Sequence, residues 1–318
     1  MTAMNKKNVN RIMDLLVCPA TKALGKGEVP LNYGEGELTC GKYSYPITKF
    51  GIPNLRLPFD QEEFTSYDDI LGDFKADTPN VEVVLEVNGL REQNVRDKIV
   101  LLGGTGSGTD IEWILSLSPK ILVCLDYSHH IENIAKAYSH QENIAFVVAD
   151  ICDLPFRSNV FDLIVSQGII QHTRSPELAF SEKVRALSPM GILSVGNLYS
   201  KNRHNNYVAM YRHKYLLHEM DRESAKKFIR RNSKFYYWMA KIGMARFHRR
   251  FHFPGVLHFA SVETRSVVYH YNNATDFYMV KYRHLTSAEE VRFWSARLDV
   301  EVFRSSKGFR ITKPKDTI

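Results

Sequence analysis

The sequence predicts an α/β fold with a seven-stranded, mostly parallel sheet and helices on both faces. Two observations predict it: short apolar runs recur from residue 98 onward, and helical patterns separate them. Runs that are apolar throughout are typical of parallel strands buried on both faces, and the helices between them serve as crossovers. A helical insertion at residues 201–285 interrupts the alternation. A small α+β domain is expected at the N-terminus, ahead of the first of these strands.

The strands are expected, in chain order, at Ile99–Leu102, Ile121–Leu125, Ile144–Val148, Phe161–Val165, Ile192–Val195, Val300–Phe303 and Phe309–Thr312. The helices of this core are expected at Asp110–Ser116, Ile131–Ala137, Pro176–Leu187 and Ala288–Leu298. The last of these helices follows the sequence Thr-Ser-Ala-Glu. We assign a capping box to Thr286 and Glu289, whose side chains would satisfy free helix N–H groups reciprocally.

The domain boundaries follow from where the alternation starts and stops. Residues 98–200 and 286–318 form the core, 1–56 the N-terminal domain, 57–97 an acidic linker with one or two helices, and 201–285 the insertion. In the N-terminal domain we expect a helix from Asn5 to Leu16 and strands near Leu38–Thr39 and Tyr45–Ile47. In the insertion we expect a helix over 224–247, with one apolar stripe opposite basic residues, formed by Phe228, Phe235, Met239 and Ile242.

The net charge of +7 is unevenly distributed along the chain. Residues 1–200 carry 18 Lys and Arg against 25 Asp and Glu, whereas residues 201–250 carry 14 against 3. A uniformly basic binder of nucleic acid does not show this division, so the chain is predicted to be an acidic body with a basic insertion.

The N-terminus lacks the apolar run of a signal peptide, and no stretch approaches the roughly 18 apolar residues of a membrane span. Four cysteines in 318 residues do not form a disulfide framework. We therefore expect a cytoplasmic protein with reduced thiols and without a transmembrane segment.

A glycine-rich loop, GGTGSGTD, follows the first strand and opens a helix. Glycines at such a turn bring a ligand against main-chain N–H groups. Asp126 and Asp150 end the next two strands, so all three features belong to the carboxyl edge of the sheet, where open α/β sheets bind ligands. A carboxylate there accepts hydrogen bonds from ribose hydroxyls; the alternative is that both aspartates only cap helices or turns.

These motifs resemble, in order and spacing, those of class I S-adenosylmethionine-dependent methyltransferases, whose sheet is Rossmann-like. GTGSGTD is similar to the family's first motif, LDYS to its ribose-binding motif and ADICDLPF to its adenine-contacting motif. FDLIVSQGIIQHT and ALSPMGILSV resemble the fourth-strand motif and the turn before strand five, and the match covers 98–200 and 286–312. A dehydrogenase shares the glycine-rich loop, but the motifs at Asp150 and after strand four favour the methyltransferase.

The resemblance implies S-adenosyl-L-methionine as the cofactor. The cofactor-binding residues that it implies are Gly104, Thr105, Gly106, Gly108, Asp126, Tyr127, Asp150, Ile151 and Gln167. Two positions depart from the family pattern. Leu102 stands where the family has an acidic residue near the methionine end of the cofactor, and Met190-Gly191 stands where it has two glycines.

The segment Leu15 to Leu55 resembles the zinc-ribbon-like domain that activates many methyltransferases. A zinc ribbon needs four tetrahedral ligands, usually from two Cys-x-x-Cys pairs. Here Cys18 is followed by Thr21 and Cys40 by Tyr43, and no histidine occurs in the first hundred residues. We predict a degenerate, metal-free domain that is stabilised by a small core.

The candidate catalytic residue is His172, in the loop after strand four, where it would act as a general base. A structural role, ordering that loop through hydrogen bonds, is the favoured alternative, as it is for Tyr282 and His284. Ser-Gln-Gly after Val165 replaces the Asn/Asp-Pro-Pro motif of amino methylases, and no Pro-Cys nucleophile is present. Nucleobase-amino and cytosine-carbon chemistry are therefore disfavoured.

The insertion combines basic and aromatic residues over 201–256. It would bind RNA, an anionic membrane, or an acidic carrier or phosphorylated substrate; otherwise it is an amphipathic lid over the acceptor pocket. The sequence thus favours methyl transfer to an oxygen or nitrogen of a small or carrier-borne molecule. The alternatives are an RNA methyltransferase and a non-catalytic methyltransferase-like scaffold. The oligomeric state is left open.

Overall fold

The computed structural model describes residues 8–58, 80–198, 215–247, 256–257, 266–306 and 308–315. The chain divides into two compact units: residues 1–199 with 284–318, and residues 200–283. The acidic stretch between residues 59 and 79, and the basic residues Arg249 and Arg250, lie outside the described parts. Among the described residues, no helix has both the length and the apolarity needed to cross a bilayer.

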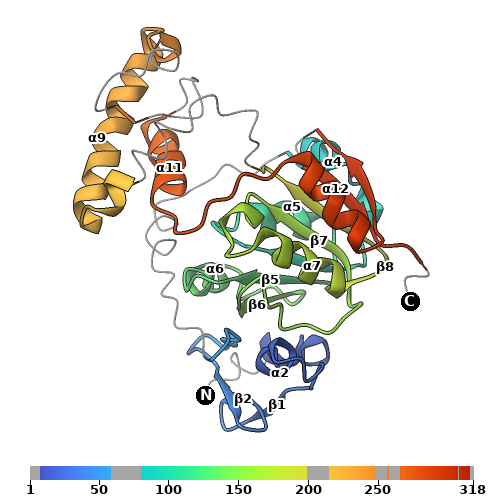
Figure 1. The fold of residues 1–318 in the computed structure, drawn as a ribbon. Helices are drawn as coiled ribbons and strands as arrows, with labels where there is room; N and C mark the ends of the chain where they lie inside the picture. The colour runs from blue at the N-terminus through green and yellow to red at the C-terminus, as the bar shows by residue number, and fades with distance from the viewer. Residues whose placement is uncertain are drawn as a thin grey trace. The chain divides into compact units, whose positions relative to one another are not determined.

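The first unit contains the predicted seven-stranded sheet (Figure 1), with the order β6-β5-β4-β7-β8-β10-β9. The five strands from β6 to β8 are parallel, whereas β10 runs antiparallel to both of its neighbours. The strands are β4 (Ile99–Gly103), β5 (Ile121–Asp126), β6 (Ile144–Val148), β7 (Phe161–Gln167), β8 (Leu187–Gly196), β9 (Glu301–Arg304) and β10 (Gly308–Thr312). The predicted mostly parallel α/β sheet is confirmed.

Alternate residues along each central strand enter two different hydrophobic clusters, because successive side chains of a strand point to opposite faces. Leu101, Val123 and Val147 pack with residues of α7 (Pro176–Ala186) and α12 (Ala288–Arg297). On the other face, residues such as Val100 and Leu122 pack with α4 (Val81–Asn88), α5 (Thr109–Ser116) and α6 (Ile131–Ala137). Helices therefore cover both faces of the sheet.

The capping box of α12 lies one residue later than predicted. Ser287, not Thr286, is the N-cap: its hydroxyl accepts from the Glu290 N–H at 3.1 Å, and its own N–H donates to the Glu290 carboxylate at 2.6 Å. The sequence Thr-Ser-Ala-Glu-Glu satisfies the capping-box spacing in both registers. Thr286 is buried in the structure, which leaves Ser287 as the residue at the helix entrance.

The fifth strand is longer than predicted. Instead of a turn ending before Ile192, β8 begins at Leu187 and includes Met190 with a φ of +63°. A Cβ added at Gly191 would lie 2.7 Å from the Ser188 carbonyl oxygen, so this irregular start of the strand requires glycine at position 191.

The N-terminal segment contains η1 (Met13–Leu15), α2 (Pro19–Ala23) and a three-stranded antiparallel sheet of β1 (Asn32–Gly34), β2 (Glu37–Cys40) and β3 (Tyr43–Pro46). The helix predicted over Asn5 to Leu16 is wrong at its end, because Leu16 and Val17 form β-bridges with Phe156 and Pro30. The segment also lacks the separate small core that we expected. Most of its buried apolar side chains belong to the cluster that covers one face of the large sheet.

The same segment lies along strand β6, as Figure 1 shows. The Leu55 N–H donates to the Val148 carbonyl at 2.7 Å, and the Val148 N–H donates to the Pro53 carbonyl at 3.0 Å. Two side chains continue this pairing. The Asn8 amide exchanges two hydrogen bonds with the backbone of Phe146, and Arg11 donates to the Ile144 carbonyl.

The linker contributes α4 and the short η2 (Glu92–Asn94), in agreement with the one or two helices expected there. Asn80 caps α4 through a hydrogen bond from the Val83 N–H, and Gly89 ends it in the left-handed conformation.

The second unit is built on α9 (Arg222–Lys241), packed against α11 (Val267–Tyr278). Asp221 caps α9 by accepting from the Ser224 N–H at 3.0 Å. The predicted apolar stripe is only partly correct, since Met239 is buried but Phe235 and Ile242 are exposed. Residues of another stripe, including Ala225, Ile229 and Tyr236, face the core instead.

Candidate functional site

The glycine-rich loop joins β4 to α5 at the carboxyl edge of the sheet. Gly104, Gly106 and Gly108 all have positive φ, between +54° and +95°. A Cβ at Gly104 would lie 2.5 Å from Ile169 Cγ1, so any other residue at this position would have to displace the Ile169 side chain. The Gly104 and Thr105 N–H groups donate to the Leu125 carbonyl, and the Thr105 hydroxyl donates to the same oxygen.

Gly106 differs from its neighbours in having open space beside it. Nothing lies within 4 Å of a Cβ built at this position. Its N–H donates to Asp126 Oδ2 at 2.7 Å, so the last residue of β5 holds the tip of the loop. Asp126 Oδ1 accepts from the Ser128 N–H at 2.9 Å. Both carboxylate oxygens of Asp126 thus accept hydrogen bonds from main-chain N–H groups.

Tyr127, which follows Asp126, is contacted from the N-terminal segment. The Arg56 guanidinium lies 5.2 Å from the centre of the Tyr127 ring, and Arg56 Nη2 is 2.9 Å from His129 Nε2. Asn54 accepts a hydrogen bond from Arg56 Nε and thereby orients its side chain. Sequence reasoning missed Arg56, because a single arginine after a strand-like segment carries no signal for a contact 71 residues along the chain.

Asp150 lies just beyond β6, next to the buried Ile151. Its Oδ1 accepts from the Cys152 N–H at 2.7 Å, and its Oδ2 forms an ion pair with Arg174 at 2.8 Å. Arg174 also pairs with Asp153. Burial lowers the pKa of the Arg174 guanidinium, but the two carboxylates outweigh burial and raise it above its ordinary value. Asp150 thus joins two neighbouring loops of the site.

Gln167 is the last residue of β7, and its side chain points to the neighbouring strand. Its amide donates to the Ser194 hydroxyl at 3.1 Å, and a Cβ at Gly196 would lie 2.0 Å from Gln167 Oε1. Leu102, where the resembled family has an acid, is fully buried in the face covered by α4 and α5. Leu102 therefore belongs to the core of the protein.

His172 ends the short helix η3 (Ile170–His172), and its side chain is buried. The His172 N–H donates to the Ile169 carbonyl at 2.8 Å. The His284 N–H donates to the Gln171 carbonyl at 2.8 Å, so the residue that begins the last part of the first unit contacts this loop. The neighbouring Gln171 is also buried, and its amide donates to the Asn197 carbonyl.

Lys183 is a buried lysine that the sequence did not single out. Its Nζ donates to the Ala179 carbonyl of its own helix at 3.2 Å, and its Cε lies 3.5 Å from a Cβ built at Gly103. Burial lowers the pKa of the Lys183 ammonium to about 8, even though the carboxylate of Asp150 acts in the opposite direction. A lysine of an amphipathic helix is expected at the surface, so no sequence signal predicts this position.

The two N-terminal cysteines are buried, as are Cys124 and Cys152 of the core. Cys18 Sγ lies 3.2 Å from the Tyr45 hydroxyl, which also accepts from the Ala20 N–H. Burial raises the pKa of the Cys18 thiol, but hydrogen bonds from Tyr45 and Thr21 outweigh it and lower the pKa. Among the described residues, no group of three or more His, Cys, Asp or Glu is arranged to hold a metal.

Residues 101–195 match the family model described as methyltransferase domain. This range contains the glycine-rich loop, both aspartates and the β7 loop. A stretch of 75 residues is 31% identical to norajmaline N-methyltransferase of Rauvolfia serpentina and covers 24% of each protein. The chain thus spans about a quarter of the length of this curated relative.

Solved structures of methyltransferases are similar to parts of the chain. A SAM-dependent methyltransferase of Aquifex aeolicus is 12% identical, with a TM-score of 0.42, and the similarity covers 79% of this chain and 98% of that one. N-methyltransferase NodS of Bradyrhizobium japonicum, solved with S-adenosyl-L-homocysteine, is 18% identical, with a TM-score of 0.37 over 44% and 74% of the two chains. At scores this low, the match of residues 101–195 to the family model is the stronger finding.

Proposed function

We propose that this chain, in which residues 101–195 form a methyltransferase domain, is an enzyme that transfers a methyl group from S-adenosyl-L-methionine to an oxygen or nitrogen acceptor. One observation carries the proposal. Within the matched range, the open position at Gly106 and the carboxylate of Asp126 lie side by side at the carboxyl edge of adjacent parallel strands. Open α/β sheets bind their ligands at this edge.

The residues present fit this cofactor. Gly106 offers a backbone turn with room beside it, and Asp126 offers a carboxylate, the kind of group that accepts hydrogen bonds from ribose hydroxyls. Gly104, Thr105, Gly108, Tyr127, Asp150, Ile151 and Gln167 complete the proposed cofactor-binding set. The cofactor supplies a methyl group activated on a sulfonium. The chain contributes position and exclusion of water, because no charge has to be stabilised on a neutral leaving group.

The acceptor in this proposal is a small or carrier-borne molecule. The name of the curated relative specifies N-methylation, which favours nitrogen as the acceptor atom. His172 is buried in the loop after β7, where a general base for an oxygen acceptor would stand. In this scheme the insertion 201–285 is the acceptor lid.

An RNA acceptor is the second candidate, and the charge of α9 favours it. Lys227, Arg230, Arg231 and Lys234 are all exposed on this helix. Cations in such a row neutralise phosphates, so RNA binding would weaken steeply with salt. Retention of RNA that does not change with salt concentration would count against this candidate.

The N-terminal segment enters the proposal as a zinc-ribbon-like domain that has lost its metal. Cys18 and Cys40 provide two thiols where a structural zinc site needs four ligands. Its role would be to support the core, with which it shares a hydrophobic cluster. A cytoplasmic location agrees with these reduced thiols.

Calorimetric titration of the full chain with S-adenosylmethionine and S-adenosylhomocysteine tests the proposal. Saturable binding of both at one site per chain is expected. If neither binds at high micromolar concentration, both enzyme hypotheses fail, and the non-catalytic scaffold is the interpretation that stays.

A further inference from the structure

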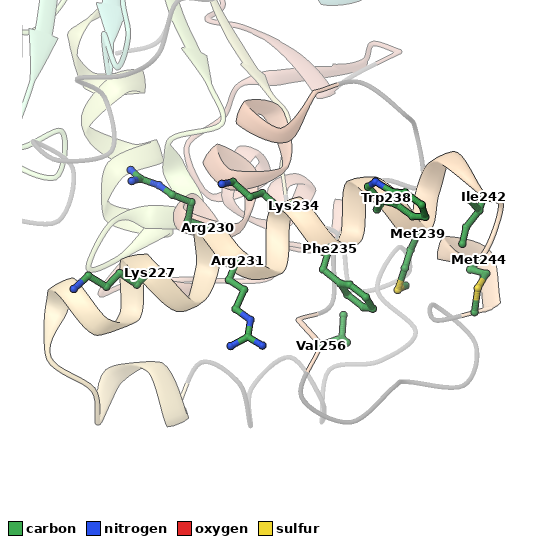
Figure 2. A pocket seen from close by; sticks show the side chains of 10 residues that line it. All are labelled: Lys227, Arg230, Arg231, Lys234, Phe235, Trp238, Met239, Ile242, Met244 and Val256. Atoms are coloured by element: carbon green, nitrogen blue, oxygen red, sulfur yellow. The ribbon is translucent and has the colours of Figure 1, made fainter.

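One side of α9 forms a groove of about 1050 Å³ within the second unit (Figure 2). We call it the α9 groove. Its lining residues are Lys227, Arg230, Arg231, Lys234, Phe235, Trp238, Met239, Ile242, Met244 and Val256. Its volume lies at the upper limit of the range for pockets that bind small organic ligands.

The groove has a cationic half and an apolar half. Lys227, Arg231 and Lys234 lie along the first part of the helix, and Trp238 and Ile242 continue the same side at helical spacing, as Figure 2 shows. Arg231 and Ile242 are separated by about 16 Å along the helix axis. The cationic side chains thus occupy one end of the groove and the apolar side chains the other, and the two kinds do not alternate along the helix.

The apolar half is exposed to solvent. Phe235, Trp238 and Ile242 are 51%, 66% and 56% exposed, whereas Met239 below them is 3% exposed. The core of this unit lies on another side of α9, where Ile229 and other residues pack on α11. Exposed apolar side chains that gather around a groove mark a binding site, because isolated ones do not form a continuous surface.

The cationic half is available for a ligand. No carboxylate among the described residues lies within ion-pair distance of Lys227, Arg231 or Lys234. Arg230 differs, since its guanidinium lies 5.3 Å from the centre of the Tyr271 ring. Cations held beside an apolar surface form strong charge-assisted hydrogen bonds with an anion.

The arrangement distinguishes between two kinds of occupant. A nucleic acid presents a phosphate at every nucleotide, so its binding sites alternate cations with aromatic stacking platforms. The α9 groove separates them and adds the aliphatic side chains of Ile242, Met244 and Val256, which offer no stacking surface. A molecule with one anionic head and one hydrocarbon tail matches this separation.

We propose that the α9 groove binds a single-chain amphiphile with an anionic head. The head, a phosphate or a carboxylate, lies against Arg231 and Lys234, and the hydrocarbon tail covers Trp238 and Ile242. This site belongs to the second unit alone and does not depend on methyl transfer.

Dodecyl phosphate, used below its micellar concentration, is the probe for this site. Trp238 reports binding, because the other two tryptophans, Trp113 and Trp294, are 1% and 8% exposed. The tail is expected to shift the emission of the full chain to shorter wavelength, and the Trp238→Phe variant should show no shift. Dodecyl maltoside and dodecyltrimethylammonium should bind about tenfold more weakly, since they lack the charge-assisted bonds.

Two variants separate the head from the tail. Arg231→Gln combined with Lys234→Gln should weaken dodecyl phosphate binding about tenfold, and Ile242→Asn should weaken all three probes. The matched control is Lys241→Gln, because Lys241 is exposed on the same helix but lies over Tyr237, outside the groove lining. Circular dichroism verifies that each variant keeps its helices.

Three results would overturn the proposal. The first is equal affinity for dodecyl phosphate and dodecyltrimethylammonium. The second is a Trp238 shift with vesicles of anionic phospholipid but not with the monomeric probe, which would make the face a membrane surface. The third is tight binding of a single-stranded oligonucleotide without any response to dodecyl phosphate. Because none of these readouts involves S-adenosylmethionine, failure here and failure of the proposed methyl transfer are independent.

Discussion

The guanidinium of Arg56 lies over the ring of Tyr127, at 5.2 Å from its centre. A residue of the N-terminal segment thus fixes the side chain that follows Asp126 in the proposed ribose-binding motif. The segment is therefore a part of the site as well as a part of the core.

Replacing Arg56 by alanine should weaken cofactor binding. The contact with Tyr127 is a cation–π interaction, worth about 0.5–1 kcal/mol at such a partly exposed site, so the dissociation constant should rise two- to fivefold. Titration with S-adenosylhomocysteine measures the effect. Lys136→Ala is the matched control, since Lys136 makes the same kind of contact with Phe50. Equal losses in both variants would contradict a specific role for Arg56.

Asp126→Ala should weaken S-adenosylhomocysteine binding by about 1–3 kcal/mol, because a charged acceptor for the ribose hydroxyls and for the Gly106 N–H is lost. Asp162→Asn provides the comparison. Asp162 also accepts a backbone hydrogen bond, from the Ile99 N–H at 2.8 Å. This bond lies at the start of β4, at the opposite end of the strand from the glycine-rich loop. That variant should lose stability and keep its affinity. Unchanged affinity in Asp126→Ala would refute the assignment.

Three glycine variants distinguish the stability cost of a positive φ from the loss of room for the cofactor. Gly25→Ala carries only the cost of positive φ, about 1–2 kcal/mol, since nothing lies within 4 Å of the added Cβ. Gly106→Ala should cost the same stability but also reduce cofactor affinity, because its methyl group enters the open space. Gly104→Ala should be the least stable of the three, since its Cβ collides with Ile169. Denaturant unfolding and calorimetry measure the two effects. Unreduced affinity in Gly106→Ala would show that the cofactor does not approach this turn.

Lys183 should make stability depend on pH. Below pH 8 it is charged in the folded and the unfolded protein, and the cost of burying the charge is fully present. Between its folded pKa of about 8 and its ordinary value of 10.5, the folded protein has released a proton that the unfolded chain still binds, so the free energy of unfolding rises with pH.

Lys183→Met should remove this rise, which amounts to at most about 3 kcal/mol. Urea unfolding of wild type and Lys183→Met from pH 7 to pH 10 gives the free energy of unfolding of each. Groups that titrate in both proteins, such as Cys152, cancel when the two free energies are subtracted at each pH. The exposed Lys120→Met serves as the control. Parallel stability curves for wild type and Lys183→Met would disprove the prediction.

The N-terminal segment should contain no zinc and should resist chelators. Metal analysis of the purified chain is expected to find far less than one zinc per chain, and EDTA should leave the melting temperature unchanged. Tyr45→Phe should instead lower the free energy of unfolding by about 1 kcal/mol, since the Ala20 N–H loses its acceptor. One zinc per chain would overturn the metal-free interpretation.

The fold was predictable because its signal is local. The buried parallel strand Ile144–Val148 is apolar at every position, and its boundaries are those predicted. The cap of α12 was misplaced by one residue because two overlapping sequences satisfy the same spacing. Only the burial of Thr286 distinguishes them, and burial is a property of the folded chain.

The glycine-rich loop and both aspartates were also predictable, since each follows a strand directly. Their partners were not. Arg174 and Lys183 reach Asp150 and Gly103 through the packing of α7 and the loop before it, which no spacing in the sequence encodes. The separation of charge and apolar surface on α9 was missed for a similar reason. The helix buries Ile229, Tyr236 and Met239 in the core that it shares with α11 but exposes Phe235 and Ile242, so a large apolar side chain does not by itself mark the packed side.

The hydrogen bonds along β6 have a consequence for self-association. A strand at the border of a sheet exposes unpaired backbone groups, to which a strand of another molecule can add. On β6 these groups are already bonded to Asn8, Arg11, Pro53 and Leu55. At the opposite border, β9 has only four residues and carries Glu301 and Arg304, which oppose such addition. Removal of the first 56 residues would open the β6 border and uncover apolar side chains beside it, and the remaining chain would aggregate.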